Sequence, residues 1–99
     1  MTYAFTIDMP GSLELYRTAH AELRKIPTDE MLLHLARPTD GGVQIVELWT
    51  SAEAFATWMA TSAGSAMNAV AAAGWTFPEL TPEPFDPAGL IVPTAGIAV

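Results

Sequence analysis

Apolar residues recur with two different spacings along the first 25 residues of the chain. Every second residue from Tyr3 to Met9 is apolar, which is the pattern of a β-strand with one buried face. Pro10-Gly11-Ser12 interrupts this alternation, and the next apolar or aromatic positions then fall on one stripe of a helix, at Leu13, Tyr16, His20 and Leu23. The pattern predicts a strand followed by an amphipathic helix that ends at Pro27.

A hairpin is predicted next. The run from Met31 to Arg37 is apolar at both alternate sets of positions, which indicates a strand between two packed layers. Asp40-Gly41-Gly42 then supplies residues that tolerate the positive φ of a tight reversal. The partner strand is predicted over Val43 to Trp49.

The second half predicts one helix and one late strand. Thr50 and Glu53 have the spacing of a capping box, and apolar residues keep a helical period after it. Weak helix formers surround Gly64, so we expect a bend or a break there. Beyond Gly74 the chain is rich in proline, and residues 89–92 are the best candidate for the fourth strand.

The predicted element order is β-α-β-β-α-β, in one domain over residues 1–99. This order is typical of an α+β, ferredoxin-like fold, in which a four-stranded antiparallel sheet carries both helices on one face. The other sheet face then needs cover. The chain is 51% hydrophobic and 15% charged with a mean hydropathy of +0.28, which is more apolar material than one small core needs. We therefore expect a homodimer that stacks the two bare sheets, with the apolar tail at 94–99 lying against the partner.

Charge and composition exclude several classes of function. A formal net charge of -7 removes any long-range attraction to nucleic acid. No run approaches the roughly 18 apolar residues of a membrane span, and the first residues lack the basic start of a signal peptide, so a cytoplasmic protein is expected. The absence of cysteine excludes disulfides, thiolate nucleophiles and iron-sulfur clusters. The two histidines lack the spacing of paired metal ligands, and no metal site is expected.

The residues from Asp40 to about Gly74 resemble a known family. The Asp-Gly hairpin, a strand ending in Trp49-Thr50-Ser51, and aromatic residues six and nine positions after Trp49, at Phe55 and Trp58, are similar to the dimeric α+β barrel superfamily. Within it, the resemblance is to the antibiotic biosynthesis monooxygenase family. It covers about a third of the chain, and the remaining elements agree in order only.

This resemblance implies cofactor-independent oxygenation of activated aromatic substrates, haem degradation, or ring-forming and isomerising steps in natural-product pathways. Haem-degrading members carry an axial histidine ten residues after the tryptophan that matches Trp58, and an asparagine on the first strand. This chain has Asn68 at the first position, and Thr6 and Asp8 on the first strand. The haem ligand is therefore missing, and the resemblance favours the branch that uses no cofactor.

Three residues are the candidate catalytic groups. His20 lies in the apolar stripe of the first helix, as a pocket base or as a structural histidine bonded to Tyr16 or to backbone. Tyr16, one turn earlier, could donate a hydrogen bond to a bound anion or simply fill the core. Arg37 could bind an enolate or carboxylate, the alternative being a salt bridge to Asp40 or Glu47.

Five further residues are candidates for substrate binding. His34 points either to the helix-side cleft or to the dimer interface, and Glu47 is either a buried base or a solvated carboxylate. The aromatic and amide candidates could equally be packing or helix-bending residues; they are Trp49, Trp58 and Asn68. Two hypotheses follow: a cofactor-independent monooxygenase, or a related cyclase or isomerase, acting on an aromatic or polyketide-like molecule; or a non-catalytic dimeric module that binds a small apolar ligand or only assembles.

Overall fold

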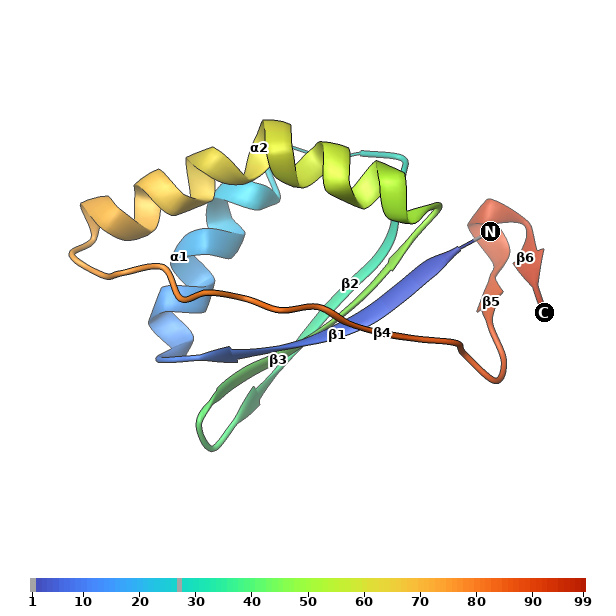
Figure 1. Cartoon of the computed structure of the whole chain (residues 1–99), viewed down its shortest axis with the longest axis horizontal. Coiled ribbons are helices and arrows are strands. Elements are labelled where there is room, and N and C mark those ends of the chain that lie inside the picture. The colour runs from blue at the N-terminus through green and yellow to red at the C-terminus, as the bar shows by residue number, and fades with distance from the viewer. Residues whose placement is uncertain (1, 27) are drawn as a thin grey trace.

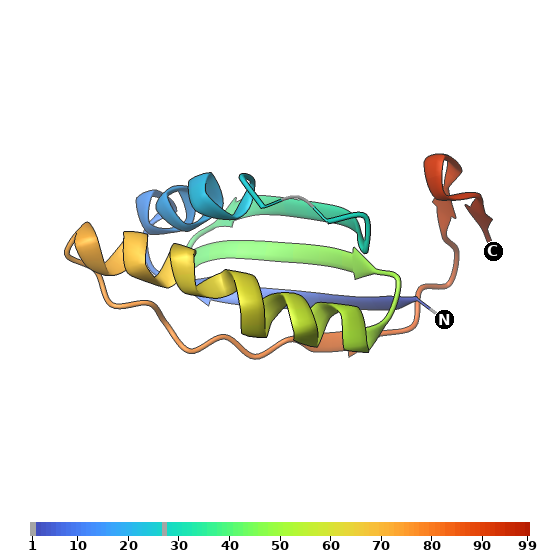
Figure 2. The same ribbon diagram turned by 90° about the horizontal axis from the view of Figure 1, so that it is seen from above.

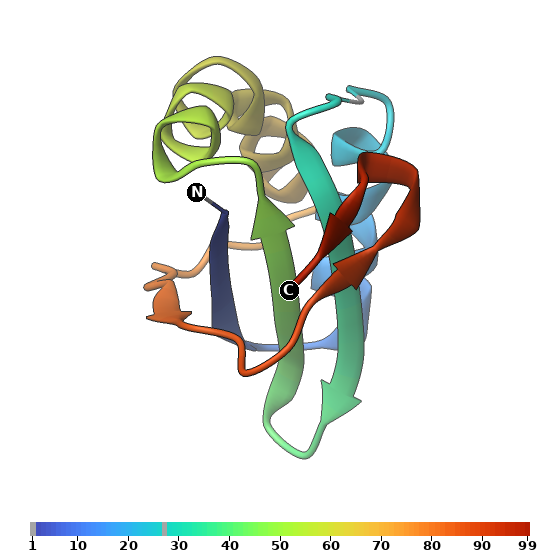
Figure 3. The same ribbon diagram turned by 90° about the vertical axis from the view of Figure 1, so that its right-hand side faces the viewer.

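Four strands form one antiparallel sheet in the computed structural model, which describes residues 2–26 and 28–99. The strands are β1 (Tyr3–Pro10), β2 (Met31–Thr39), β3 (Gly42–Trp49) and β4 (Glu83–Phe85), and their order across the sheet is β2-β3-β1-β4. Figure 3 shows them side by side in this order. The predicted α+β class with a four-stranded antiparallel sheet is confirmed, and the strand order is compatible with a ferredoxin-like fold.

Two helices lie on the same face of this sheet (Figures 1 and 2), namely α1 (Leu13–Leu23) and α2 (Ala52–Ala72). Ser12 caps α1 by accepting a hydrogen bond from the Leu15 amide. The predicted end of this helix at Pro27 lies outside the described residues. The last helical residue is Leu23.

The second helix starts one residue later than the capping box predicts and has no break. Ser51, in an extended conformation, is the N-cap and accepts a hydrogen bond of 3.0 Å from the Ala54 amide. The Thr50 hydroxyl instead donates to the carboxylate of Glu30. The expected break near Gly64 is wrong, because α2 runs without interruption over 21 residues. Ala66 and Val70 are buried just beyond Gly64, and packing of this face compensates for the weak helix propensity.

The fourth strand of the sheet lies earlier in the chain than predicted. It is Glu83–Phe85, which pairs with β1 at the sheet edge, where the missing amide hydrogen of Pro84 is tolerated. The predicted strand at 89–92 overlaps β5 (Ile91–Val92), which pairs with β6 (Ile97–Ala98) and not with the main sheet. A short 3-10 turn (Pro93–Ala95) connects β5 to β6. The C-terminal tail therefore folds back on itself as a small hairpin apart from the main sheet (Figure 1).

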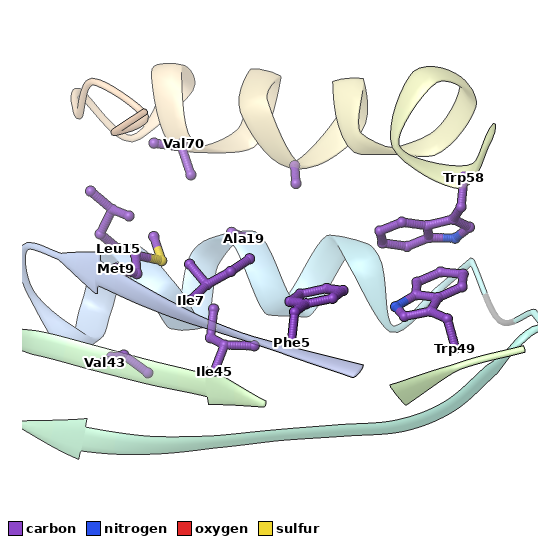
Figure 4. Packing of buried hydrophobic residues seen from close by; sticks show 11 residues of the cluster. Phe5, Ile7, Met9, Leu15, Ala19, Val43, Ile45, Trp49, Trp58 and Val70 are labelled. Atoms are coloured by element: carbon purple, nitrogen blue, oxygen red, sulfur yellow. The ribbon is translucent and has the colours of Figure 1, made fainter. Parts of the chain in front are cut away.

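The core lies between the helices and the sheet (Figure 4). Phe5 and Trp49 are fully buried on the inner sheet face, and Val70 is fully buried on α2. The inner positions of β1 and β3 share this face because side chains alternate along a strand. Strand register places Ile7 opposite Ile45 and Met9 opposite Val43, so this part of the two strands presents an apolar surface to the helices.

The opposite face of the sheet also carries large apolar side chains, and no helix covers it within the described part of the chain. Leu33 pairs with Leu48, and Leu35 with Val46, on this outer face. Leu33 and Leu35 are 45% and 57% exposed, and Phe85 contributes a further exposed ring on the edge strand. These exposed large side chains form the outer apolar face of the sheet.

Candidate functional site

A cleft separates the helices from the sheet and holds two adjoining cavities. The larger has a volume of about 480 Å³ and the smaller about 280 Å³. Both are bounded by His20, Leu23, His34, Glu47 and Trp58, so they are neighbouring parts of one site. The larger volume lies within the usual range for small-molecule sites.

Most of the wall of the larger cavity is apolar. One part comes from α2, through Phe55, Trp58, Met59, Ala63, Ala66 and Met67. Another comes from the proline-rich segment between α2 and β4, through Phe77, Pro78, Leu80 and Pro82. An occupant that fits this wall is itself largely apolar.

One wall of the cleft carries a chain of hydrogen bonds through four polar side chains. The Oε2 atom of Glu47 is 2.6 Å from Nδ1 of His34, and Nε2 of His34 is 2.7 Å from the hydroxyl of Tyr16. The same hydroxyl is 3.3 Å from Nδ1 of His20. We call this set the Glu47-His34-Tyr16-His20 chain.

Strand alternation and helix period bring the members of this chain together. Glu47 shares the inner face of β3 with Ile45 and Trp49, and His34 is its direct partner on β2. Tyr16 and His20 are four residues apart on α1 and therefore lie on the same side of that helix. Two strands and one helix thus supply four polar groups to one wall.

The carboxylate of Glu47 is buried but fully partnered. Glu47 is only 8% exposed. Oε1 accepts a hydrogen bond of 2.8 Å from the indole Nε1 of Trp49, while Oε2 faces His34. Two partners offset the large cost of burying this group.

The surroundings move two pKa values in opposite directions. Burial, followed by the negative charge of Glu47, raises the pKa of Tyr16 above 10.0, so the phenol keeps its proton. Burial, followed by the neighbouring His34 and Arg24, lowers the pKa of His20 below 6.5. At neutral pH, His20 is therefore an uncharged imidazole that can accept a proton.

The three rings of the chain also lie nearly parallel. The rings of Tyr16 and His34 are inclined by 6°, and those of His20 and His34 by 22° with centroids 5.3 Å apart. This packing restricts rotation of both imidazoles. The hydrogen-bonding atoms of the chain are therefore held in fixed directions.

The cleft contains five of the eight residues that the sequence nominates. Tyr16, His20, His34, Glu47 and Trp58 all line it. The open alternatives for two of them are decided: His34 points to the helix-side cleft, and Glu47 points inward. Trp49 is fully buried and lines neither cavity.

Arg37 and Asn68 lie away from the cleft. Arg37 is on the outer sheet face, because it alternates with Ala36 on β2, and its Nε donates to Oε1 of Gln44 at 2.8 Å. It makes no salt bridge with Asp40 or Glu47 within the described residues. Asn68 is exposed on α2, two positions from the buried Ala66 and Val70.

Sequence reasoning missed the proline-rich wall of the cleft. Phe77 and Leu80 pack against the core from a segment with no regular structure. Their signal in the sequence is two large apolar residues among prolines and acidic residues, which indicates a buried segment of loop. Arg24, at the edge of the smaller cavity, was also missed, because the helical pattern places it on the polar face of the first helix, whereas it follows the last helical residue of α1.

Residues 2–26 and 28–99 contain neither a metal-binding cluster nor a membrane-spanning helix. No group of three or more histidine, aspartate or glutamate side chains there is arranged to hold a metal ion. Neither helix is long and apolar enough to cross a membrane.

No family model, curated protein or solved structure matches the chain.

Proposed function

We propose that this protein is a cofactor-independent monooxygenase, or a related cyclase or isomerase, that acts on an aromatic or polyketide-like molecule in the cleft. The observation that carries the proposal is the Glu47-His34-Tyr16-His20 chain on the wall of an apolar cavity of about 480 Å³. A neutral imidazole beside an apolar volume is suited to removing a weakly acidic proton from a bound ring system. The likeness of the Asp40–Gly74 region to the antibiotic biosynthesis monooxygenases supports the same chemistry.

The proposed reaction begins with proton transfer from the substrate to an imidazole of the cleft. The substrate is a hydroxylated polycyclic molecule with an acidic methylene group, and its anion supplies the electrons for reaction with dioxygen. Oxidation of the methylene to a carbonyl transfers four electrons to dioxygen: one oxygen atom becomes the carbonyl oxygen, and the other leaves as water with the two methylene hydrogens. In a cyclase or isomerase, the same deprotonation would start bond formation or proton migration without dioxygen.

The role of the chain in this reaction follows from its hydrogen bonds. The carboxylate of Glu47 stabilises the positive charge that develops on His34 or His20 when a proton arrives. Tyr16 connects the two imidazoles and keeps its own proton because its pKa is raised. Trp58 and Phe55 offer aromatic surfaces to a planar substrate.

The proposal includes a homodimer of the dimeric α+β barrel type. The outer apolar face of the sheet supports it, because Leu33, Leu35 and Phe85 are all more than 40% exposed there. Stacking this face against a second copy would remove these side chains from water.

The test of the proposal is oxygen uptake with anthrone and hydroxylated anthrones, which have an acidic methylene group. We expect consumption of one dioxygen per molecule and at least a tenfold lower rate in His20→Asn. Arg17→Gln is the matched control on α1, because Arg17 is exposed, pairs with Glu14 and lies outside both cavities. Equal rates in the wild type, in His20→Asn and without protein would contradict the proposed chemistry.

The alternative is a non-catalytic module that binds a small apolar ligand, and the predominantly apolar wall of the cleft favours it. Binding of the same anthrones, followed by quenching of tryptophan fluorescence, separates the two hypotheses. Ala63→Phe should abolish binding by filling the cavity, whereas Ala60→Phe, on the exposed side of α2, should not. Binding blocked by Ala63→Phe without any turnover supports the module.

A further inference from the structure

Trp49 fixes the roles of the two oxygen atoms of Glu47. An indole Nε1 can only donate, so Oε1 of Glu47 is the acceptor of their 2.8 Å hydrogen bond. The remaining oxygen, Oε2, lies 2.6 Å from Nδ1 of His34. An ionised carboxylate has no hydrogen to give, so Nδ1 of His34 carries the proton between them.

The tautomer of His34 then sets the direction of the next hydrogen bond. When His34 is neutral and protonated at Nδ1, it has a lone pair at Nε2, so the hydroxyl of Tyr16 donates to Nε2 across 2.7 Å. A hydroxyl has one hydrogen, and this bond uses it. Tyr16 can therefore only accept in its second hydrogen bond, the 3.3 Å contact with Nδ1 of His20.

His20 is the last member of the hydrogen-bonded Glu47-His34-Tyr16-His20 chain. Its Nδ1 must donate to Tyr16, which leaves the lone pair of a neutral imidazole at Nε2. That atom makes no hydrogen bond within the described part of the chain. No buried side-chain nitrogen or oxygen there lacks a partner, so Nε2 is accessible, and His20 borders both cavities.

We infer that Glu47 is a positioning residue that acts through His34 and Tyr16 to hold His20 in its Nδ1-protonated tautomer, so that Nε2 of His20 accepts a hydrogen bond from the ligand. The ligand class that fits is a phenol or enol, which has a donor hydroxyl, and not an ether or ketone of the same shape. This ligand class rests on the proposed function, but the tautomer does not.

Glu47→Gln provides a sharp test because Trp49 dictates how the new amide lies. The indole donor holds the amide oxygen toward Trp49, so the NH₂ group faces Nδ1 of His34. His34 must then accept at Nδ1 and carry its proton at Nε2, which donates to Tyr16. Tyr16 in turn donates to Nδ1 of His20, and the proton of His20 moves to Nε2. One isosteric substitution thus reverses the whole chain.

The experiment is nitrogen-15 NMR of the ligand-free protein, labelled at histidine, at about pH 8.5, which is about two pH units above the ordinary pKa of an imidazole. Protonated and unprotonated ring nitrogens have well-separated chemical shifts. In the wild type we expect both histidines to be protonated at Nδ1, and in Glu47→Gln both at Nε2. Glu53→Gln, an exposed acid in the first turn of α2, should leave both tautomers unchanged. A wild-type His20 protonated at Nε2 would overturn the inference.

Tyr16→Phe tests the same coupling without touching the buried carboxylate. His34 should stay protonated at Nδ1 because Glu47 still faces it, while His20 should become a mixture of the two tautomers. A His20 that keeps one tautomer in Tyr16→Phe would show that Tyr16 does not set it, and would contradict the inference even if Glu47→Gln fails to fold.

Ligand chemistry is tested with 2-naphthol and 2-methoxynaphthalene, which differ in the donor hydroxyl. We expect 2-naphthol to bind the wild type at least tenfold more tightly, and the ratio to fall toward one in Glu47→Gln. Equal affinities for the wild type would overturn the inferred ligand class. These readouts need no turnover, so a protein with the inferred tautomers and no oxygen uptake would refute the proposed monooxygenase activity alone.

Discussion

The indole of Trp49 donates a hydrogen bond of 2.8 Å to the carboxylate of Glu47, which lies two residues earlier on the same strand. Residues two apart on a strand point to the same face, so the contact is a direct product of β-geometry. Trp49 is fully buried and lines neither cavity. Its contribution to the cleft is to hold the carboxylate that partners His34.

Trp49→Phe should lower the free energy of unfolding by about 2–4 kcal/mol. The change leaves Oε1 of the buried Glu47 without its donor and removes part of a large buried ring. Urea denaturation measures the effect. Trp75→Phe is the control, because Trp75 is 36% exposed and should change stability by less than about 0.5 kcal/mol. Similar losses in both variants would show that the buried hydrogen bond contributes little.

Acid should destabilise the protein partly through His20. The pKa of His20 is lowered below 6.5 in the folded chain, so in the range just below pH 6.5 the unfolded chain binds a proton there that the folded chain does not. The stability that depends on neutral His20 is therefore complete above about pH 6.5 and is lost as the pH falls through the folded pKa. Urea unfolding of His20→Asn between pH 7 and pH 5 should show a smaller decline than that of the wild type. An identical decline in both proteins would mean that the pKa of His20 is the same in both states.

Gly42→Ala should disrupt the start of β3. A Cβ at Gly42 would collide with the backbone carbonyl oxygen of Met9 on the neighbouring strand, and backbone cannot move aside as a flexible side chain can. We expect a loss of about 2 kcal/mol or more in the free energy of unfolding. Gly41→Ala is the adjacent control, since a Cβ at Gly41 would meet no other atom within 4 Å, and this variant should unfold at nearly the same urea concentration as the wild type.

Leu35→Glu tests the proposed homodimer. Leu35 is 57% exposed on the outer apolar face, so a charge there is tolerated in a monomer but opposes stacking of two sheets. Light scattering should give twice the 10.5 kDa chain mass for the wild type and the single mass for Leu35→Glu. Ile91→Glu, in the C-terminal hairpin and 75% exposed, is the control and should remain dimeric. A monomeric wild type would refute the homodimer.

Several elements were predictable because their signals are local. The alternation from Tyr3 to Met9, the glycines of the β2-β3 turn and the stripe of α1 depend only on neighbouring residues, and each produced the expected element. The start of α2 was misplaced by one residue, because Thr50 is drawn to Glu30 on a distant loop. The fourth strand was misplaced for a similar reason. A segment of two or three residues becomes a strand only where it can pair with the exposed edge of a sheet, and Glu83–Phe85 is the segment that pairs with β1.

The candidate site was likewise predictable only where its features depend on neighbouring residues. The sequence alone determined which groups the chain has for chemistry: two histidines, no cysteine, a tyrosine and a histidine on one helix stripe, and a glutamate in register with buried residues. Only the tertiary structure decided that His34 and Glu47 face the helices, that Tyr16 bridges both imidazoles, and that Arg37 lies on the other side of the sheet. The reason is physical. Period and propensity fix the relative directions of side chains within one element, whereas which face becomes the core depends on how separate elements pack.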